Sequence, residues 1–143
     1  MSIEENKELI RRYIEVGNNI KGDTSKVRTM AEEFLAPDFV SHHSLAGDMK
    51  PEQWITSYEA LFSAFPDMQY TIVDMIAEGD RVAVQYISKG THRGIFQGIP
   101  PTEKQIIVTG VGIYRIAQGR FKEIWAFVDT FSMMQQLGVI PSK

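Results

Sequence analysis

The hydrophobic spacing of this chain changes once, near Met68, from a helical period to an alternating one. Before that point, apolar residues recur every three to four positions in three segments, which are 2–16, 25–36 and 51–65. After it, alternation runs through four segments, which are 70–77, 81–92, 105–116 and 120–129. Glycine-containing turns at 78–80 and 117–119 join these strands in pairs. Helices followed by strands predict an α+β protein whose helices cover one face of an antiparallel sheet of about four long strands.

Composition agrees with one globular domain over residues 1–143, with 43% hydrophobic and 23% charged residues. The net charge of -3 and the scattered Lys and Arg residues argue against a nucleic-acid surface. The chain has no cysteine, which excludes disulfides, thiolate metal sites and a cysteine nucleophile. No run approaches the ~18 apolar residues of a membrane helix, and the N-terminal residues do not resemble a signal peptide. We therefore expect a cytoplasmic protein that does not bind membranes.

Two glycines interrupt the third long strand. Gly110 and Gly112 are two residues apart, so both lie on the same face of that strand. Glycine inside a strand marks either a bend of the sheet or the close approach of a neighbouring group. The sequence leaves both interpretations open.

Three blocks of sequence resemble the SnoaL-like polyketide cyclase (ester cyclase) family of the nuclear-transport-factor-like superfamily. They are Ala-Phe-Pro-Asp at 64–67, the glycine- and proline-rich stretch at 90–102, and Tyr-Arg-Ile with the following Gly-Arg, Glu-Ile-Trp, Asp and Gln-Leu-Gly between 114 and 138. Arg93, Ile95 and Glu103 depart from the family pattern in the loop over the expected pocket mouth, which leaves the substrate open.

The resemblance implies a cone-shaped fold, with three N-terminal helices packed on the concave face of the curved sheet and a deep pocket between them. It also implies a homodimer formed through the outer face of the sheet. The implied chemistry needs neither metal nor organic cofactor. A carboxylate acts as acid and base in the intramolecular aldol closure of a polyketide ester.

Asp129 is the candidate acid/base, because the resemblance places the aspartate of the cyclases at this position. Alternation along the last strand predicts one face that carries Phe121, Glu123, Trp125, Phe127 and Asp129. A carboxylate beside aromatic rings is expected to have a raised pKa. The alternative is that Asp129 is the N-cap of a short helix that starts at Thr130.

Three histidines are further candidates: His42, His43 and His92. His42 and His43 are adjacent in an extended segment, so at most one of them faces the pocket. Each histidine is a possible hydrogen-bond partner or clamp for the substrate, or else a surface or loop residue. Their spacing lacks the pairs typical of metal sites, so we expect no metal.

The predicted pocket wall is apolar and aromatic, as in most small-molecule sites. Tyr86 and Tyr114 offer hydroxyls for a developing oxyanion, unless these hydroxyls only bond to backbone. Loop 94–101 is expected near the mouth. The predicted wall residues are Met30, Phe34, Trp54, Tyr58, Phe62, Tyr86, Tyr114, Trp125 and Phe127.

Three classes of function remain open from the sequence. The chain is a cyclase acting on a hydrophobic small molecule, another pocket enzyme such as an isomerase, dehydratase or hydrolase, or a non-catalytic binding or dimerisation module. Self-association is expected because helices cover only one face of the sheet. The residues predicted to form the apolar patch on the open face are Ile106, Val108, Ile124 and Val128.

Overall fold

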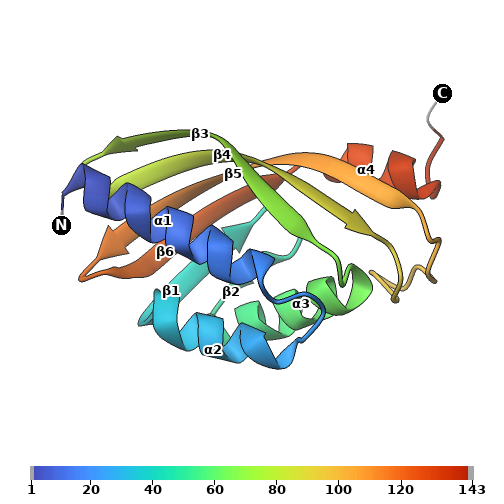
Figure 1. Cartoon of the computed structure of the whole chain (residues 1–143), viewed down its shortest axis with the longest axis horizontal. Coiled ribbons are helices and arrows are strands. Elements are labelled where there is room, and N and C mark those ends of the chain that lie inside the picture. Colours follow the sequence, from blue (N-terminus) through green and yellow to red (C-terminus); the bar gives the residue numbers. More distant parts are fainter. Residues whose placement is uncertain (1, 142–143) are drawn as a thin grey trace.

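A computed structural model describes residues 2–141 as a strongly curved sheet with helices against its concave side (Figure 1). The helices in this range are α1 (Ile3–Asn18), α2 (Ser25–Phe34), α3 (Pro51–Ala64) and α4 (Thr130–Leu137). The strands are β1 (Leu35–His43), β2 (Gly47–Met49), β3 (Gln69–Glu78), β4 (Arg81–Thr91), β5 (Gln105–Ala117) and β6 (Arg120–Val128). Their order in the sheet is β2-β1-β6-β5-β4-β3.

The predicted α+β class and the four long strands are confirmed, but the sheet is larger and mixed. The structure adds β1 and β2 at one edge, and β1 runs parallel to β6 while every other pair is antiparallel. The second predicted helix ends at Phe34 and the chain becomes extended before Pro37, as expected for residues that precede a proline. Pro37 lies where the β1–β6 register shifts, between Leu35 and Val40. Proline is tolerated there because no regular ladder bond is lost.

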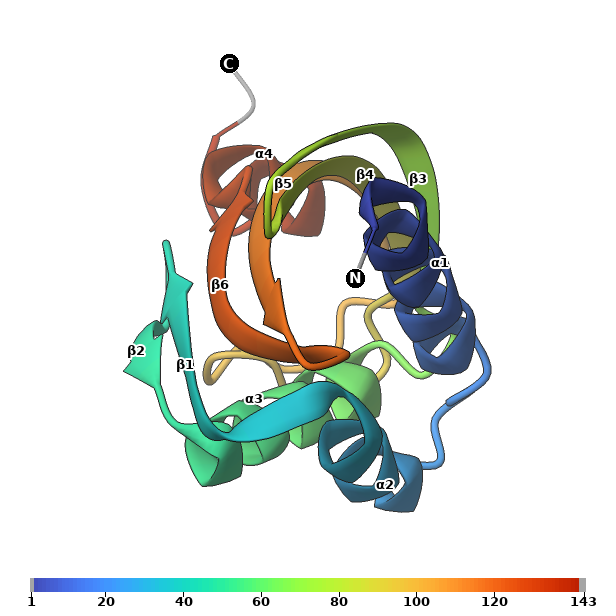
Figure 2. The ribbon, with the colours of Figure 1, turned by 90° about the vertical axis from the view of Figure 1, so that its left-hand side faces the viewer.

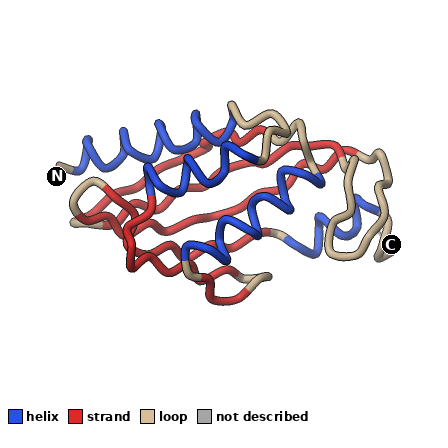
Figure 3. Tube along the Cα trace, turned by 90° about the horizontal axis from the view of Figure 1, so that it is seen from below, coloured by secondary structure: helices blue, strands red, loops and turns tan. Residues whose placement is uncertain are grey.

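The concave side of the sheet is covered by the first three helices, as the resemblance implied. Figure 2 shows the sheet curling around α1, α2 and α3, with α4 on the opposite side. Figure 3, the view from below, shows that the first three helices run roughly along the strands. α4 is fastened to β5 by Gln136, whose side chain bonds the N–H and the carbonyl of Ile107 at 2.7 and 2.9 Å. None of the helices within residues 2–141 is long and apolar enough to cross a membrane.

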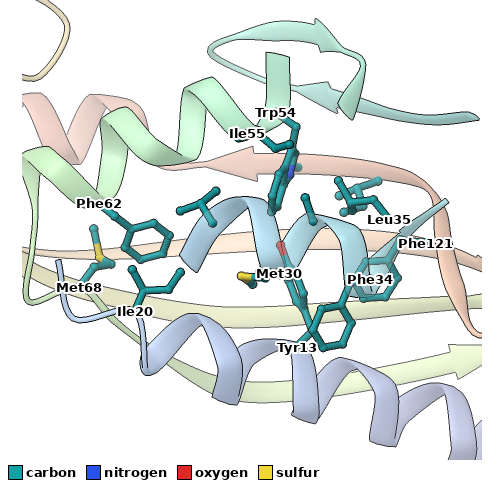
Figure 4. Packing of buried hydrophobic residues seen from close by; sticks show 14 of the residues in the cluster. Tyr13, Ile20, Met30, Phe34, Leu35, Trp54, Ile55, Phe62, Met68 and Phe121 are labelled. Carbon is teal, nitrogen blue, oxygen red and sulfur yellow. The ribbon is translucent and has the colours of Figure 1, made fainter. Parts of the chain in front are cut away.

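Aromatic residues fill the space between helices and sheet (Figure 4). Phe34 and Phe121 are fully buried, and the Tyr13 ring meets both of them edge-on, with centroids 5.3 and 4.9 Å away. Burial of each such side chain contributes about 1.5–3 kcal/mol. This core holds α1 and α2 on the sheet and fixes one end of the cavity described below.

An irregularity in β6 changes which side chains face inward. Ile116 pairs with Phe121, whereas Arg115 pairs with Glu123, so β6 contains one extra residue at this point. Such a bulge reverses the alternation beyond it. Phe121 therefore faces the core, but Trp125 and Phe127 lie on the outer face, and the single face predicted for 121–129 is wrong.

The apolar patch predicted on the open face is also wrong. Ile106, Val108 and Ile124 are buried on the concave side, and Val128 borders the cavity. The exposed apolar side chains of the outer face are those one position away on β5 and β6. Val111 pairs there with Phe127, which is 53% exposed.

Candidate functional site

A cavity with two adjoining chambers lies between the sheet, the helices and the loop that precedes β5. The outer chamber measures about 250 Å³ and the inner chamber about 30 Å³. Tyr58, Tyr70 and Tyr86 border both chambers and separate them. The outer chamber is lined by His43, Leu45, Ala46, Thr56, Ser57, Tyr58, Ala60, Leu61, Met68, Tyr70, Tyr86, Ser88, Ile95, Phe96, Gln97, Val128, Thr130 and Met133. The inner chamber is lined by Tyr13, Ile14, Gly17, Met30, Tyr58, Phe62, Tyr70, Tyr86 and Tyr114.

All five tyrosines of the chain border the inner chamber, one each from α1, α3, β3, β4 and β5. Burial raises the pKa of Tyr86 to about 12 and that of each other tyrosine further. The five phenols are therefore neutral hydroxyls at neutral pH. Apart from these five tyrosines and His43, no described wall residue of either chamber has a side chain that titrates.

Gly110 and Gly112 allow two of these tyrosine rings to lie close to the sheet. A Cβ at Gly110 would lie 2.4 Å from Cζ of Tyr86, and one at Gly112 would lie 2.7 Å from Cε1 of Tyr114. Real Cβ atoms do not come this close to a ring. Of the two interpretations left open by the sequence, the structure shows the close approach of a neighbour at both positions.

His43 faces the outer chamber, whereas His42 does not, in agreement with the prediction that at most one of them would. Nδ1 of His43 accepts the backbone N–H groups of Leu45 and Ala46 at 3.0 and 3.2 Å. Because a backbone N–H only donates, Nδ1 must carry the lone pair and the ring proton must reside on Nε2. Burial lowers the pKa of His43, so the side chain is a neutral imidazole with one N–H to donate.

His42 lies on the outer face of the sheet. Its Nδ1 is 2.9 Å from Asp48 and its Nε2 is 2.6 Å from Glu123, and its ring stacks on Trp125. Hydrogen bonds to Glu123 and then Asp48 raise the pKa of His42, because each favours the imidazolium ion. This histidine links β1 to its two neighbouring strands and has no access to the cavity.

His92 is fully buried at the start of the loop and stacks on Phe65. Its Nδ1 accepts the Thr102 N–H at 3.2 Å, so the proton again resides on Nε2. Nε2 has no partner among the described residues, and His92 does not line either chamber. The histidines are thus dispersed. Residues 2–141 contain no group of three or more His, Asp or Glu side chains placed to hold a metal ion.

Asp129 occupies the N-cap of α4. Its Oδ1 accepts the N–H of Ser132 at 3.0 Å, and its side chain is exposed. Val128 and Thr130 line the outer chamber on either side of it, but Asp129 does not. The expected apolar pocket around Asp129 is absent: beyond the β6 bulge Trp125 and Phe127 lie on the outer face, and none of these three residues lines the cavity. The geometry is that of the alternative N-cap role, and an acid/base role would need the carboxylate to leave the cap.

The other predicted wall residues divide into two groups. Met30, Tyr58, Phe62, Tyr86 and Tyr114 line the cavity. Phe34 and Trp54 belong to the buried core instead, and Trp125 lies outside under Arg81, whose guanidinium is 4.9 Å from the ring centroid. Sequence reasoning missed Tyr13 and Tyr70. Tyr13 shares the buried stripe of a helix, so its spacing alone does not separate a wall residue from a core residue.

A curved, unclosed sheet with helices on its concave side, enclosing an uncharged aromatic cavity, defines a protein of the α+β cone class. The family model for SnoaL-like polyketide cyclases matches residues 7–137. The chain therefore belongs to the SnoaL-like polyketide cyclase family. No curated protein matches it.

Several solved structures are similar over almost the whole chain. AclR, a proposed hydroxylase from Streptomyces galilaeus, is 25% identical with a TM-score of 0.86, covering 98% of this chain and 100% of its own. A proposed SnoaL-like polyketide cyclase from Jannaschia sp. CCS1 is 26% identical with a TM-score of 0.84, covering 99% and 97%. IdmH, a proposed polyketide cyclase from Streptomyces antibioticus, is 29% identical with a TM-score of 0.78, covering 93% and 98%.

Proposed function

We propose that this chain closes a ring in a hydrophobic polyketide ester by an intramolecular aldol reaction, using only its own side chains. The observation that carries the proposal is the state of His43 in the outer chamber. Its Nδ1 is occupied by two backbone amides, so Nε2–H is a fixed donor. In a buried site such a donor stabilises an oxygen on which negative charge develops.

In this reaction one proton would move from a substrate carbon to the base and then from the base to a substrate oxygen. A base takes a proton from the carbon between two carbonyl groups, and one of those carbonyls becomes an enolate oxygen that accepts a hydrogen bond from His43 Nε2. The enolate carbon then bonds to a ketone carbon of the same molecule. The resulting alkoxide takes up the proton that the base removed, so the closure needs no other reactant.

Asp129 is the proposed base, since its neighbours Val128 and Thr130 both line the outer chamber. Its carboxylate must first release the Ser132 N–H, and loss of an N-cap bond costs about 1 kcal/mol. That cost is small compared with the ~10²–10⁴ in rate that a positioned acid/base supplies. The resemblance supports this role, whereas the exposed N-cap position of the side chain does not.

Non-catalytic binding is the second candidate, because no carboxylate lines the described walls of either chamber. One experiment separates the two. Turnover and binding of a cyclisable polyketide ester are measured for the wild type, His43→Leu, Asp129→Asn and Asp129→Ser. Both Asp129 variants retain a good N-cap residue, so a loss of turnover reports on the acid.

For the cyclase, we expect turnover to fall about 10²–10³-fold in His43→Leu and about 10²–10⁴-fold in both Asp129 variants. Full turnover in the Asp129 variants would remove Asp129 as the base. Binding without turnover in the wild type would establish the second candidate, and the absence of both would refute the two proposals together.

We also infer a homodimer formed through the outer face of the sheet. Ile107, Val111 and Phe127 are exposed there, as is Phe131 of α4, and apolar patches of this kind commonly form interfaces. Light scattering should give about twice the 16.2 kDa of one chain. Phe127→Lys should shift the protein to monomer, and a monomeric wild type at micromolar concentration would contradict the inference.

A further inference from the structure

The inner chamber is unusual because its wall is formed by five tyrosines whose hydroxyls make no hydrogen bond to the described part of the protein. Within residues 2–141, no tyrosine hydroxyl has a hydrogen-bond partner. The outer chamber differs, since the hydroxyls of Ser88 and Thr130 donate to the carbonyls of Val108 and Val128. The enclosed side-chain atoms without a partner among the described residues are Asn6 Oδ1 and His92 Nε2. The phenol oxygens are not enclosed in this way, so they are accessible to whatever occupies the cavity and free to hydrogen-bond to it.

The five tyrosines also share one space. They border the same chamber, and two pairs of their rings are in contact, Tyr13 with Tyr114 at 5.9 Å and Tyr70 with Tyr86 at 5.7 Å between centroids. No two of their hydroxyls are bonded together. They therefore surround a gap, and its volume of about 30 Å³ has room for about one to three non-hydrogen atoms.

Gly110 and Gly112 indicate that this arrangement is built into the strand. Each lacks the side chain that would displace a tyrosine ring, Tyr86 in one case and Tyr114 in the other. Glycine weakens a strand interior relative to alanine. Two such positions under two of the five rings therefore accommodate the tyrosines of the inner chamber at a cost in the stability of β5.

We propose that the inner chamber is a binding subsite for a single carbonyl or phenolic oxygen of the ligand, held by the tyrosine hydroxyls. The proposal rests on the proposed function only in that the rest of the ligand lies in the outer chamber. No positively charged side chain borders the inner chamber, and burial of an unpaired full charge is costly. The subsite therefore suits a carbonyl or phenol and disfavours a carboxylate or phosphate.

A matched pair of probes tests this directly. 2-Naphthol and 2-methylnaphthalene have nearly the same shape, and only the first carries an oxygen. One net hydrogen bond contributes about 0.5–1.5 kcal/mol, so 2-naphthol should bind about 2- to 13-fold more tightly. The affinities are measured by titration of the intact protein.

Tyr13 and Tyr114 border only the inner chamber, so Tyr13→Phe, Tyr114→Phe and the double variant locate the effect. The affinity ratio should fall toward one in the double variant, while the affinity for 2-methylnaphthalene stays the same. All five tyrosines border the inner chamber, so no tyrosine elsewhere can serve as a control. The control is instead Thr71→Val, which removes a hydroxyl from the surface. A crystal structure of the complex then places the oxygen.

Equal affinities in the wild type would overturn the subsite, as would an unchanged ratio in the double variant or no binding of either probe. Thermal melting of each variant verifies that it is folded. The probes undergo no reaction, so the result is independent of turnover. Equal affinities of the wild type for the two probes, together with normal turnover of a polyketide ester, would refute the subsite alone. Preference of the wild type for 2-naphthol without turnover of the ester would refute the cyclase alone.

Discussion

Replacement of the two strand glycines by alanine should affect stability in the order opposite to the contact distances. The new Cβ would be 2.4 Å from the nearest Tyr86 atom at Gly110 and 2.7 Å from the nearest Tyr114 atom at Gly112. Distance alone therefore predicts that Gly110→Ala is worse. We expect Gly112→Ala to be worse, because the two rings differ in their freedom to move.

Tyr114 is confined on several sides. It is buried, and its ring lies 5.9 Å from Tyr13 and 5.0 Å from Phe121 between centroids. Tyr86 is only half-buried and borders both chambers, so its ring can swing into open space. Overpacking costs about 1–3 kcal/mol, and we assign the upper part of this range to Gly112 and the lower end to Gly110.

Alanine also recovers the ~0.5–1 kcal/mol that glycine loses in a strand. The net cost should then be about 1–2.5 kcal/mol for Gly112→Ala and under about 0.5 kcal/mol for Gly110→Ala. For a chain of this size, 1 kcal/mol corresponds to roughly 2–4 °C in Tm. Chemical denaturation and thermal melting of both variants measure the difference.

The Tyr114→Ala background provides the control for this reasoning. With the ring removed, Gly112→Ala should no longer destabilise and should gain up to about 1 kcal/mol. A cost for Gly112→Ala that is the same with and without the Tyr114 ring would show that the close approach is irrelevant. Greater destabilisation by Gly110→Ala would refute the argument from ring freedom.

Three further predictions concern single side chains. The pKa of His42 is raised from 6.5, so its contribution to the stability of the folded protein is present below pH 6.5 and is lost as the pH rises through the folded-state pKa. His42→Gln should therefore destabilise the protein more at pH 5.5 than at pH 8. Equal effects at the two pH values in urea denaturation would contradict this. The pKa of His43 is lowered from 6.5, so this histidine has the opposite effect on the pH dependence of stability. The stability of the wild type relative to His43→Leu should decline as the pH falls below 6.5. A decline as the pH rises above 6.5 would contradict this. Asp129→Ala should lower the free energy of unfolding by about 1 kcal/mol, because it removes the N-cap hydrogen bond to the Ser132 N–H. Asp129→Asn should lower it little. Similar losses in both variants would indicate that the N-cap bond is not the cause.

The order and number of the main elements were predictable, because periodicity and turn residues are local. α4 begins at Thr130, as the N-cap alternative for Asp129 required, and the Gly79 and Gly119 turns both close hairpins. The parallel pairing of β1 with β6 joins segments more than 80 residues apart. No local pattern in either strand specifies such a partner.

The candidate site was less predictable for a specific reason. Alternation along β6 holds only while its pairing is regular, and the bulge near Phe121 reverses it. That one residue places Trp125 and Phe127 on the outer face instead of in the predicted wall, and Asp129, which follows them, is exposed. The histidine prediction did not depend on the bulge, because adjacent residues of an extended strand face opposite ways in any register.

The five tyrosines show why the cavity is better understood as a polar site than as a gap in the core. A phenol hydroxyl that is partly withdrawn from water without a protein partner costs part of its desolvation penalty, and phenylalanine would fill nearly the same volume without that cost. A chain selected only for a stable core would therefore carry phenylalanine at Tyr13 and Tyr114, whose hydroxyls make no hydrogen bond within residues 2–141. The hydroxyls remain, and the two glycines that accommodate Tyr86 and Tyr114 weaken β5 further. Both features oppose stability and both act on the same small chamber, so a single requirement, the binding of an oxygen inside it, explains them together.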